Sequence, residues 1–229
     1  MNSKRIVILG DSLGMPRARD YGEIDYEDTY PYLLMNSIKN CEFISRHRRA
    51  NDTNKQLISQ YIKDDIEMLK PDILVVHLGI VDCAPRVLLR YQNAIVSILP
   101  SMIRKIILKI ISKFRYDITK LNNKTYVKKN KFKENIGKIV DISDRIGMQL
   151  IFIEILMTTE ENNKRSYNFN KNIMEYNAII EMSAMSKHVS LIKYDPKNNY
   201  LLNDGIHINK KGNKFLANKI NELVGQLIE

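Results

Sequence analysis

The chain has only two cysteines and no long hydrophobic stretch, and each absence excludes a class of protein. Cys41 and Cys83 cannot form the disulfide framework of a small secreted domain, and no cysteine or histidine spacing matches a zinc site. No stretch reaches the roughly 18 consecutive apolar residues of a membrane-spanning helix. The apolar run 6–9 is too short for a signal peptide. We therefore expect a cytoplasmic protein that holds no metal and no other cofactor.

Acidic residues are nearly absent from one stretch, 104–133, and this stretch accounts for the net charge of the chain. It holds eleven basic residues against one acid, Asp117, a difference equal to the chain's +10. None of the known nucleic-acid-binding motifs accompanies it, so we expect no nucleic acid partner. An anionic membrane surface, an acidic ligand and a plain solvated face all remain open.

Short apolar runs alternate with helical periods along the whole chain. The expected strands are 5–9, 41–45, 73–78, 149–154 and 189–194; the expected helices are 29–39, 53–69, 87–114, 131–146, 170–185 and 210–228. At 229 residues and 44% hydrophobic content, the chain suits a single domain over 1–229. The alternation predicts an α/β fold, a three-layer α/β/α sandwich around a five-stranded parallel sheet. In such sheets ligands bind beyond the carboxyl ends of the strands.

The connection between the third and fourth expected strands is longer than one crossover helix requires. An apolar stripe within it recurs at spacings of three and four, beside a row of lysines at spacings of four; the stripe is Ile103, Ile106, Ile107, Ile110, Ile111 and Phe114, and the row is Lys105, Lys109 and Lys113. The segment 122–130 that follows is polar. We interpret about 87–134 as an inserted helix and loop, either a lid or a docking surface, with peripheral contact to an anionic membrane through 103–133 as one role. The alternative is an ordinary amphipathic helix whose stripe packs on the domain.

A serine follows the first expected strand directly, in Gly10-Asp11-Ser12-Leu13-Gly14. Flanking glycines place such a serine on a tight turn with its hydroxyl exposed. The run matches the nucleophile elbow of α/β-hydrolases, but that elbow needs several preceding strands and only nine residues precede Gly10. We therefore expect a nucleophilic serine in a different fold.

An aspartate three residues before a histidine, Asp204 and His207, follows the last expected strand. On one loop, the carboxylate can accept from imidazole Nδ1 and leave Nε2 facing a hydroxyl. With the serine at the end of the first strand, this spacing predicts a Ser12–His207–Asp204 triad.

Together these blocks resemble the GDSL-type, or SGNH, hydrolase family. Its first block, Gly-Asp-Ser-Leu, is matched in full by residues 10–13, and its last block, Asp-x-x-His, by Asp204 and His207. The resemblance implies a flavodoxin-like sandwich, a serine nucleophile and no metal. Members of the family include lipases, thioesterases, carbohydrate deacetylases and O-acyltransferases.

The two middle blocks depart from the family pattern. Asn51 stands where the family has a glycine whose backbone N–H enters the oxyanion hole, and asparagine tolerates the left-handed backbone region better than other side chains. Val81, in Gly79-Ile80-Val81-Asp82, stands where an asparagine side chain normally donates to the oxyanion. The expected oxyanion donors are the N–H groups of Ser12 and Asn51, with help from Gly79. Losing one such donor typically lowers turnover by about 10²–10³-fold.

Residues beside the blocks are candidates for contact with the substrate. These are Asp11, Asp82 and Arg86; Arg86 is always charged and suits a carboxylate, a phosphate or the oxyanion. Asp82 is expected to support its loop rather than react. His77 lies within an apolar run and is interpreted as a core histidine, and Cys83 as a small buried hydrophobe.

The resemblance and the triad favour hydrolysis of an O-acyl ester, acetyl in the first instance, on a small molecule or a glycan. An O-acyltransferase of surface polysaccharide biosynthesis would use the same triad while excluding water. A glycan-binding relative without activity is the third interpretation, motivated by Val81.

Overall fold

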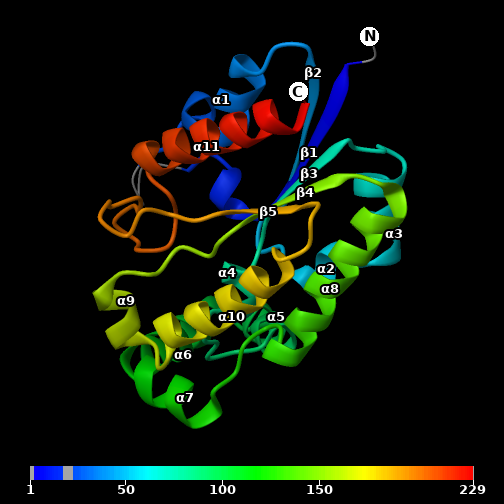
Figure 1. The fold of residues 1–229 in the computed structure, drawn as a ribbon. Helices are drawn as coiled ribbons and strands as arrows, with labels where there is room; N and C mark the ends of the chain where they lie inside the picture. Colours follow the sequence, from blue (N-terminus) through cyan, green and yellow to red (C-terminus); the bar gives the residue numbers. More distant parts are fainter. Residues whose placement is uncertain (1–2, 18–22, 229) are drawn as a thin grey trace.

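Five parallel strands form the central layer of the computed structural model, which describes residues 3–17 and 23–228 (Figure 1). The strands are β1 (Lys4–Gly10), β2 (Cys41–His47), β3 (Ile73–His77), β4 (Gln149–Ile153) and β5 (Val189–Ile192). Their order in the sheet is β2-β1-β3-β4-β5. β1 therefore lies inside the sheet, and the two flanking strands shield its carboxyl end. All five expected strands are present; β2 ends two residues later than predicted, and β5 ends two residues earlier.

Helices cover both faces of the sheet, as Figure 1 shows. One face carries α1 (Tyr30–Ser37) and α11 (Lys210–Ile228); the other carries α8 (Lys129–Ile146) and α10 (Phe169–Ser183). Successive residues of β1 serve the two faces in turn: Ile6 and Ile8 lie in the core under α1 and α11, whereas Val7 and Leu9 lie in the core under α8 and α10. The predicted three-layer α/β/α sandwich is confirmed.

The predicted helix 53–69 is wrong, because the chain forms three short segments there. These are α2 (Thr53–Gln56), α3 (Ser59–Ile62) and a π-helical turn, η4 (Lys63–Glu67), with extended backbone at Ile58 between the first two. The interruption accompanies an inward-facing acid: Asp65 is buried and accepts two hydrogen bonds from the Arg48 guanidinium, at 2.7 and 2.9 Å. A buried carboxylate needs such a partner.

The predicted helix 87–114 is divided at Pro100 into α5 (Arg90–Ile98) and α6 (Ser101–Lys113). Proline has no backbone N–H and begins a helix more readily than it continues one. A further helix, α7 (Arg115–Asn122), precedes the polar segment.

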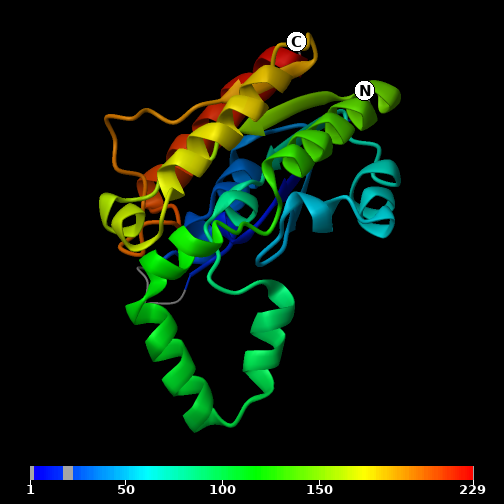
Figure 2. The same ribbon diagram turned by 90° about the horizontal axis from the view of Figure 1, so that it is seen from below.

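No residue of α5 or α6 is buried, and the two helices project from the layers as a hairpin (Figure 2). The alternative in which the apolar stripe packs on the domain is therefore wrong. The physical reason is that α8 and α10 already cover the adjacent sheet face. In the described ranges 3–17 and 23–228, no helix has the length and apolarity to cross a bilayer.

Replacing Gly79 with alanine tests the backbone of the loop after β3. Gly79 has φ +131°, and a Cβ there would lie 2.5 Å from the Cδ1 atom of buried Ile155. We expect Gly79→Ala to lower the free energy of unfolding by about 1–3 kcal/mol, measured by urea denaturation. Gly137→Ala is the matched control, because a Cβ inside α8 meets nothing within 4 Å; it should stabilise by about 0.5–1 kcal/mol. Equal effects at the two positions would contradict this account.

Candidate active site

Ser12 lies on a single turn of 3₁₀ helix, η1 (Ser12–Gly14), that begins where β1 ends. Asp11 caps this turn, since its Oδ1 atom accepts the N–H of Leu13 at 2.8 Å. The cap and the abrupt end of the strand direct the serine toward the carboxyl edge of the sheet.

The imidazole of His47 lies directly beneath the turn. His47 is the partner of Gly10 in the parallel pairing of β1 with β2. A Cβ on either Gly10 or Gly14 would lie 2.2 Å from His47 Nε2, so only glycine fits at both positions. The hydroxyl of Tyr30 connects His47 Nε2 (2.8 Å) to His77 Nδ1 (3.1 Å). Sequence reasoning missed His47, and the signal was its place opposite Gly10 in the sheet register.

The last loop places Asp204 and His207 against the serine. Ser12 Oγ lies 3.1 Å from His207 Nε2, and His207 Nδ1 lies 2.5 Å from Asp204 Oδ2. The other carboxylate oxygen, Oδ1, accepts the N–H groups of Ile206 and His207, each at 2.9 Å. The three residues of the predicted triad are thus brought together in the order that nucleophilic catalysis requires.

Residues that carry no motif hold this loop in place. The Asn162 side-chain amide donates to the Asp204 carbonyl, and the Thr158 hydroxyl donates to the Gly205 carbonyl, both at 2.6 Å. Gly205 has φ +67°, and a Cβ there would lie 2.3 Å from the hydroxyl of Thr159. α9 (Glu160–Arg165) and the residues before it therefore clamp the triad loop, and nothing local in the sequence marks them.

The charges of the site follow from burial and hydrogen bonding. Burial alone would raise the pKa of Asp204, but the hydrogen bonds from His207 and from two backbone N–H groups lower it to about 2. Asp204 therefore stays ionised and keeps the histidine proton on Nδ1. Burial raises the pKa of Asp11 to about 7 against the opposing Leu13 N–H, and burial also raises that of Asp82 to about 7 against the hydrogen bonds from Thr53.

A pocket of about 260 Å³ opens at Ser12 and His207. Its apolar wall consists of Leu13, Ala50, Ile80, Val81, Ala84, Phe169 and Ile206. Its polar lining residues, besides Ser12 and His207, are Arg17, Arg86 and Tyr126, and no acidic side chain lines it among the described residues. Arg86 lies 4.0 Å above the Tyr126 ring and donates to the Val81 carbonyl at 2.8 Å. The predicted candidate Arg86 therefore lies in the pocket.

Two of the predicted substrate contacts need correction. Asp11 and Asp82 are fully buried and do not line the pocket, so neither touches a ligand there. Asp82 instead accepts the Thr53 N–H at 3.0 Å and the Thr53 hydroxyl at 2.6 Å, which fixes the loop after β2. His77 and Cys83 are also buried, and burial raises the pKa of the Cys83 thiol well above its usual range.

The middle blocks also differ from the expected geometry. The left-handed residue is Ala50, with φ +50°, and not Asn51. The Asn51 N–H donates to the Arg48 carbonyl at 3.3 Å, and its side-chain amide contacts Gly10 and Gln56 inside the domain. Ala50 and Val81 line the pocket, whereas Asn51 and Gly79 do not. The left-handed backbone position, which the block predicts at Asn51, is therefore at Ala50, one residue earlier.

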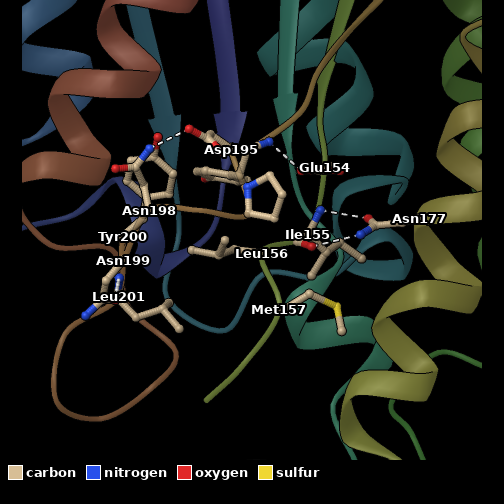
Figure 3. A pocket seen from close by; sticks show the side chains of 12 residues that line it. Glu154, Ile155, Leu156, Met157, Asn177, Asp195, Asn198, Asn199, Tyr200 and Leu201 are labelled. Carbon is tan, nitrogen blue, oxygen red and sulfur yellow. Dashed lines mark hydrogen bonds between the residues drawn. The ribbon is translucent and has the colours of Figure 1, made fainter. Parts of the chain in front are cut away.

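Two other features resemble sites but serve the fold. Ser143, His188 and Asp144 repeat the hydrogen-bond order of a triad, at 2.9 and 3.1 Å, but Ser143 is fully buried within α8. A pocket of about 220 Å³ lies at the ends of β4 and β5 (Figure 3). The Asn177 side chain there accepts the N–H of Ile155 and donates to the Ile155 carbonyl, each at 2.8 Å. The polar atoms of Asn177 are therefore already bonded within the protein.

No protein-family model and no curated protein sequence matches the chain. Solved structures do match it over nearly the whole length. A lipase/acylhydrolase from Enterococcus faecalis has 14% identity and a TM-score of 0.64, covering 96% of this chain and 95% of its own. A GDSL-like lipase from Bacteroides thetaiotaomicron has 15% identity and a TM-score of 0.61, covering 98% and 89%.

An acetylxylan esterase from Geobacillus stearothermophilus, a catalytic mutant, has 15% identity and a TM-score of 0.63, covering 98% and 95%. The chain therefore has the fold of the GDSL-type, or SGNH, hydrolases. The resemblance drawn from the sequence is confirmed as a likeness of fold.

The neutral state of His47 gives the site a testable pH dependence. Burial lowers the pKa of His47 from 6.5 to about 4. Because that pKa is lower in the folded protein, neutral His47 contributes stability fully above 6.5 and loses it as the pH falls toward about 4. We expect the difference in unfolding free energy between wild type and His47→Gln to shrink over this range. Urea denaturation measures it, and NMR should show no His47 titration above about pH 5; a titration near 6.5 would contradict it.

Proposed function

We propose that the protein is a serine-dependent hydrolase of O-acyl esters that acts through a Ser12–His207–Asp204 triad and an acyl-enzyme. The observation that carries the proposal is the unbroken chain of hydrogen bonds from Asp204 through His207 to Ser12, which ends in an open pocket. The buried Ser143 shows by contrast what such a chain looks like where no ligand can enter. The structural likeness to GDSL-type lipases and acetylxylan esterases supports the same reaction class.

In the proposed mechanism, Ser12 Oγ attacks the acyl carbonyl while His207 Nε2 takes the hydroxyl proton. Asp204 fixes the tautomer and stabilises the imidazolium that forms. His207 then gives the proton to the leaving alkoxide, and the acyl group stays on Ser12. Water, deprotonated by His207, attacks this ester, and the released acid leaves Ser12 with its proton restored. The Ser12 N–H is the proposed oxyanion donor of the nucleophile turn, since Asn51 is bonded elsewhere.

The size and lining of the pocket suggest a small acyl group on a polar carrier. The space of about 260 Å³, bounded by leucine, alanine, isoleucine, valine and phenylalanine side chains, holds a short acyl group such as acetyl together with part of its alcohol. Arg17, Arg86 and Tyr126 also line the pocket and carry donor groups, which suits an alcohol part rich in oxygen, such as a carbohydrate. Transfer of the acyl group to a sugar hydroxyl would use the same residues, and product analysis with an acceptor present separates transfer from hydrolysis.

A fluorophosphonate probe tests the triad directly. We expect rapid labelling at Ser12, loss of labelling in Ser12→Ala and His207→Ala, and slow labelling in Asp204→Asn, because only a base-activated serine attacks the probe. Mass spectrometry of the modified peptide locates the adduct. Ser143→Ala is the matched control and should label as the wild type does. Equal labelling of wild type and His207→Ala would remove the triad from this account.

Val81→Asn tests the departure in the third block. Val81 lines the pocket beside Ser12, and an amide there would supply the donor that the family places at this position. We expect turnover of an aryl acetate to rise by up to about 10²-fold. Val81→Ala controls for the change of volume and should not raise turnover. If Val81→Asn has unchanged or lower turnover, another group already stabilises the oxyanion, and Arg86→Ala becomes the informative variant.

A further inference from the structure

Each helix of the α5–α6 hairpin, residues 90–113, carries an apolar face, and no residue of either helix is buried. Figure 2 shows both helices extending away from the three layers. Its side chains are exposed to an extent unusual for large hydrophobic residues: Ile98 81%, Met102 74%, Ile106 55% and Ile110 52%. Soluble proteins rarely expose contiguous apolar surface without a partner for it. We therefore expect a partner to cover the apolar surface of the hairpin.

Three exposed isoleucines of α6 form one stripe. Ile103, Ile106 and Ile110 follow at spacings of three and four, so they lie on one face of the helix. Tyr91, Ile95 and Ile98 follow the same rule on α5 and are exposed as well. Each helix thus presents an apolar side of two turns or more.

Positive charge borders the stripe, and no negative charge opposes it. α6 carries Arg104, Lys105, Lys109 and Lys113, and the sequence has no acidic residue between 83 and 116. In the part of the chain that the structure describes, the three lysines have no ion-pair partner. Lysines that flank an apolar stripe are typical of helices that lie in the interface of an anionic membrane.

We propose that the α5–α6 hairpin is a docking surface for an anionic lipid bilayer. The isoleucines enter the boundary between headgroups and acyl chains, and the lysines contact the acidic headgroups. A second copy of this chain fits less well, because a symmetric contact would bring the same uncompensated cations face to face. A nucleic acid would use the cations but leave the isoleucine stripe exposed.

The base of the hairpin lies at the pocket of Ser12. Arg90, the first residue of α5, pairs with Asp52 and lies 4.6 Å above the ring of Tyr126. Tyr126 and Arg86 line the pocket. The backbone N–H of Arg86 donates to the carbonyl of Lys124 at 2.7 Å, which joins the two ends of the inserted segment. Docking would therefore hold the pocket next to the membrane. Resting on the proposed function, this favours an ester carried by a membrane-anchored molecule.

Co-sedimentation with vesicles tests the surface in the full-length protein. We expect binding to vesicles that mix phosphatidylglycerol with phosphatidylcholine at low salt, a marked decrease at high salt, and little binding to pure phosphatidylcholine. Ile106→Asp with Ile110→Asp, and separately Lys105→Glu with Lys109→Glu, should each lower the partition coefficient by about tenfold or more. Because all four side chains are exposed, the variants should fold normally.

Matched controls change equally exposed residues elsewhere. Met185→Asp and, separately, Lys187→Glu change residues beyond the end of α10. Both variants should bind the anionic vesicles as the wild type does. Fluorophosphonate labelling of the hairpin variants in the absence of vesicles should be unchanged, so failure of docking and failure of the proposed chemistry give different results. The proposal is overturned if the wild type does not sediment with anionic vesicles at low salt, or if the isoleucine variant binds as tightly as the wild type. A dimer in solution that Ile106→Asp with Ile110→Asp dissolves would also overturn it, in favour of a second copy.

Discussion

The contact between the Ser12 turn, residues 10–14, and the His47 ring is the constraint on which the site depends. Two residues without side chains, Gly10 and Gly14, lie against this imidazole, and the parallel register of β1 and β2 brings them together. Burial keeps His47 and His77 uncharged, with pKa values of about 4 and about 3. The serine therefore stands on a neutral, hydrogen-bonded support rather than on apolar packing alone. Such a support has directional preferences, which apolar packing lacks.

The two ends of the chain meet at the site, but they are held differently. Ser12 is positioned by the sheet, whereas His207, which lies 195 residues further along the chain, is positioned by a loop that α9 and Thr158 clamp. Half of the geometry of the proposed triad thus depends on a short helix that contributes no residue to it. Displacement of α9, which has no buried residue, would separate His207 from Ser12.

The pocket and the projecting hairpin share their supports. Tyr126 receives two guanidinium groups, from Arg86 in the pocket and from Arg90 at the start of α5. The buried Asp82, through Thr53, steadies the loop that carries Asp52, the partner of Arg90. Whatever binds the hairpin is therefore linked, through contacts of a few residues, to the wall beside Ser12.

The sequence by itself determined the features that are local. Apolar runs predicted all five strands, and the spacing of Asp204 and His207 predicted their hydrogen bond, because hydrogen bonds over a few residues follow from spacing. The contact between Ser12 and His207, 195 residues apart, depends on the folded chain. The folded chain alone decided which residue faces which. It buried Asp11 and Asp82, moved the left-handed position from Asn51 to Ala50, and placed His47 under the serine. It also left the stripe of α6 uncovered. Periodicity shows that one face of a helix is apolar, but what covers that face depends on the surfaces that the rest of the chain has already used.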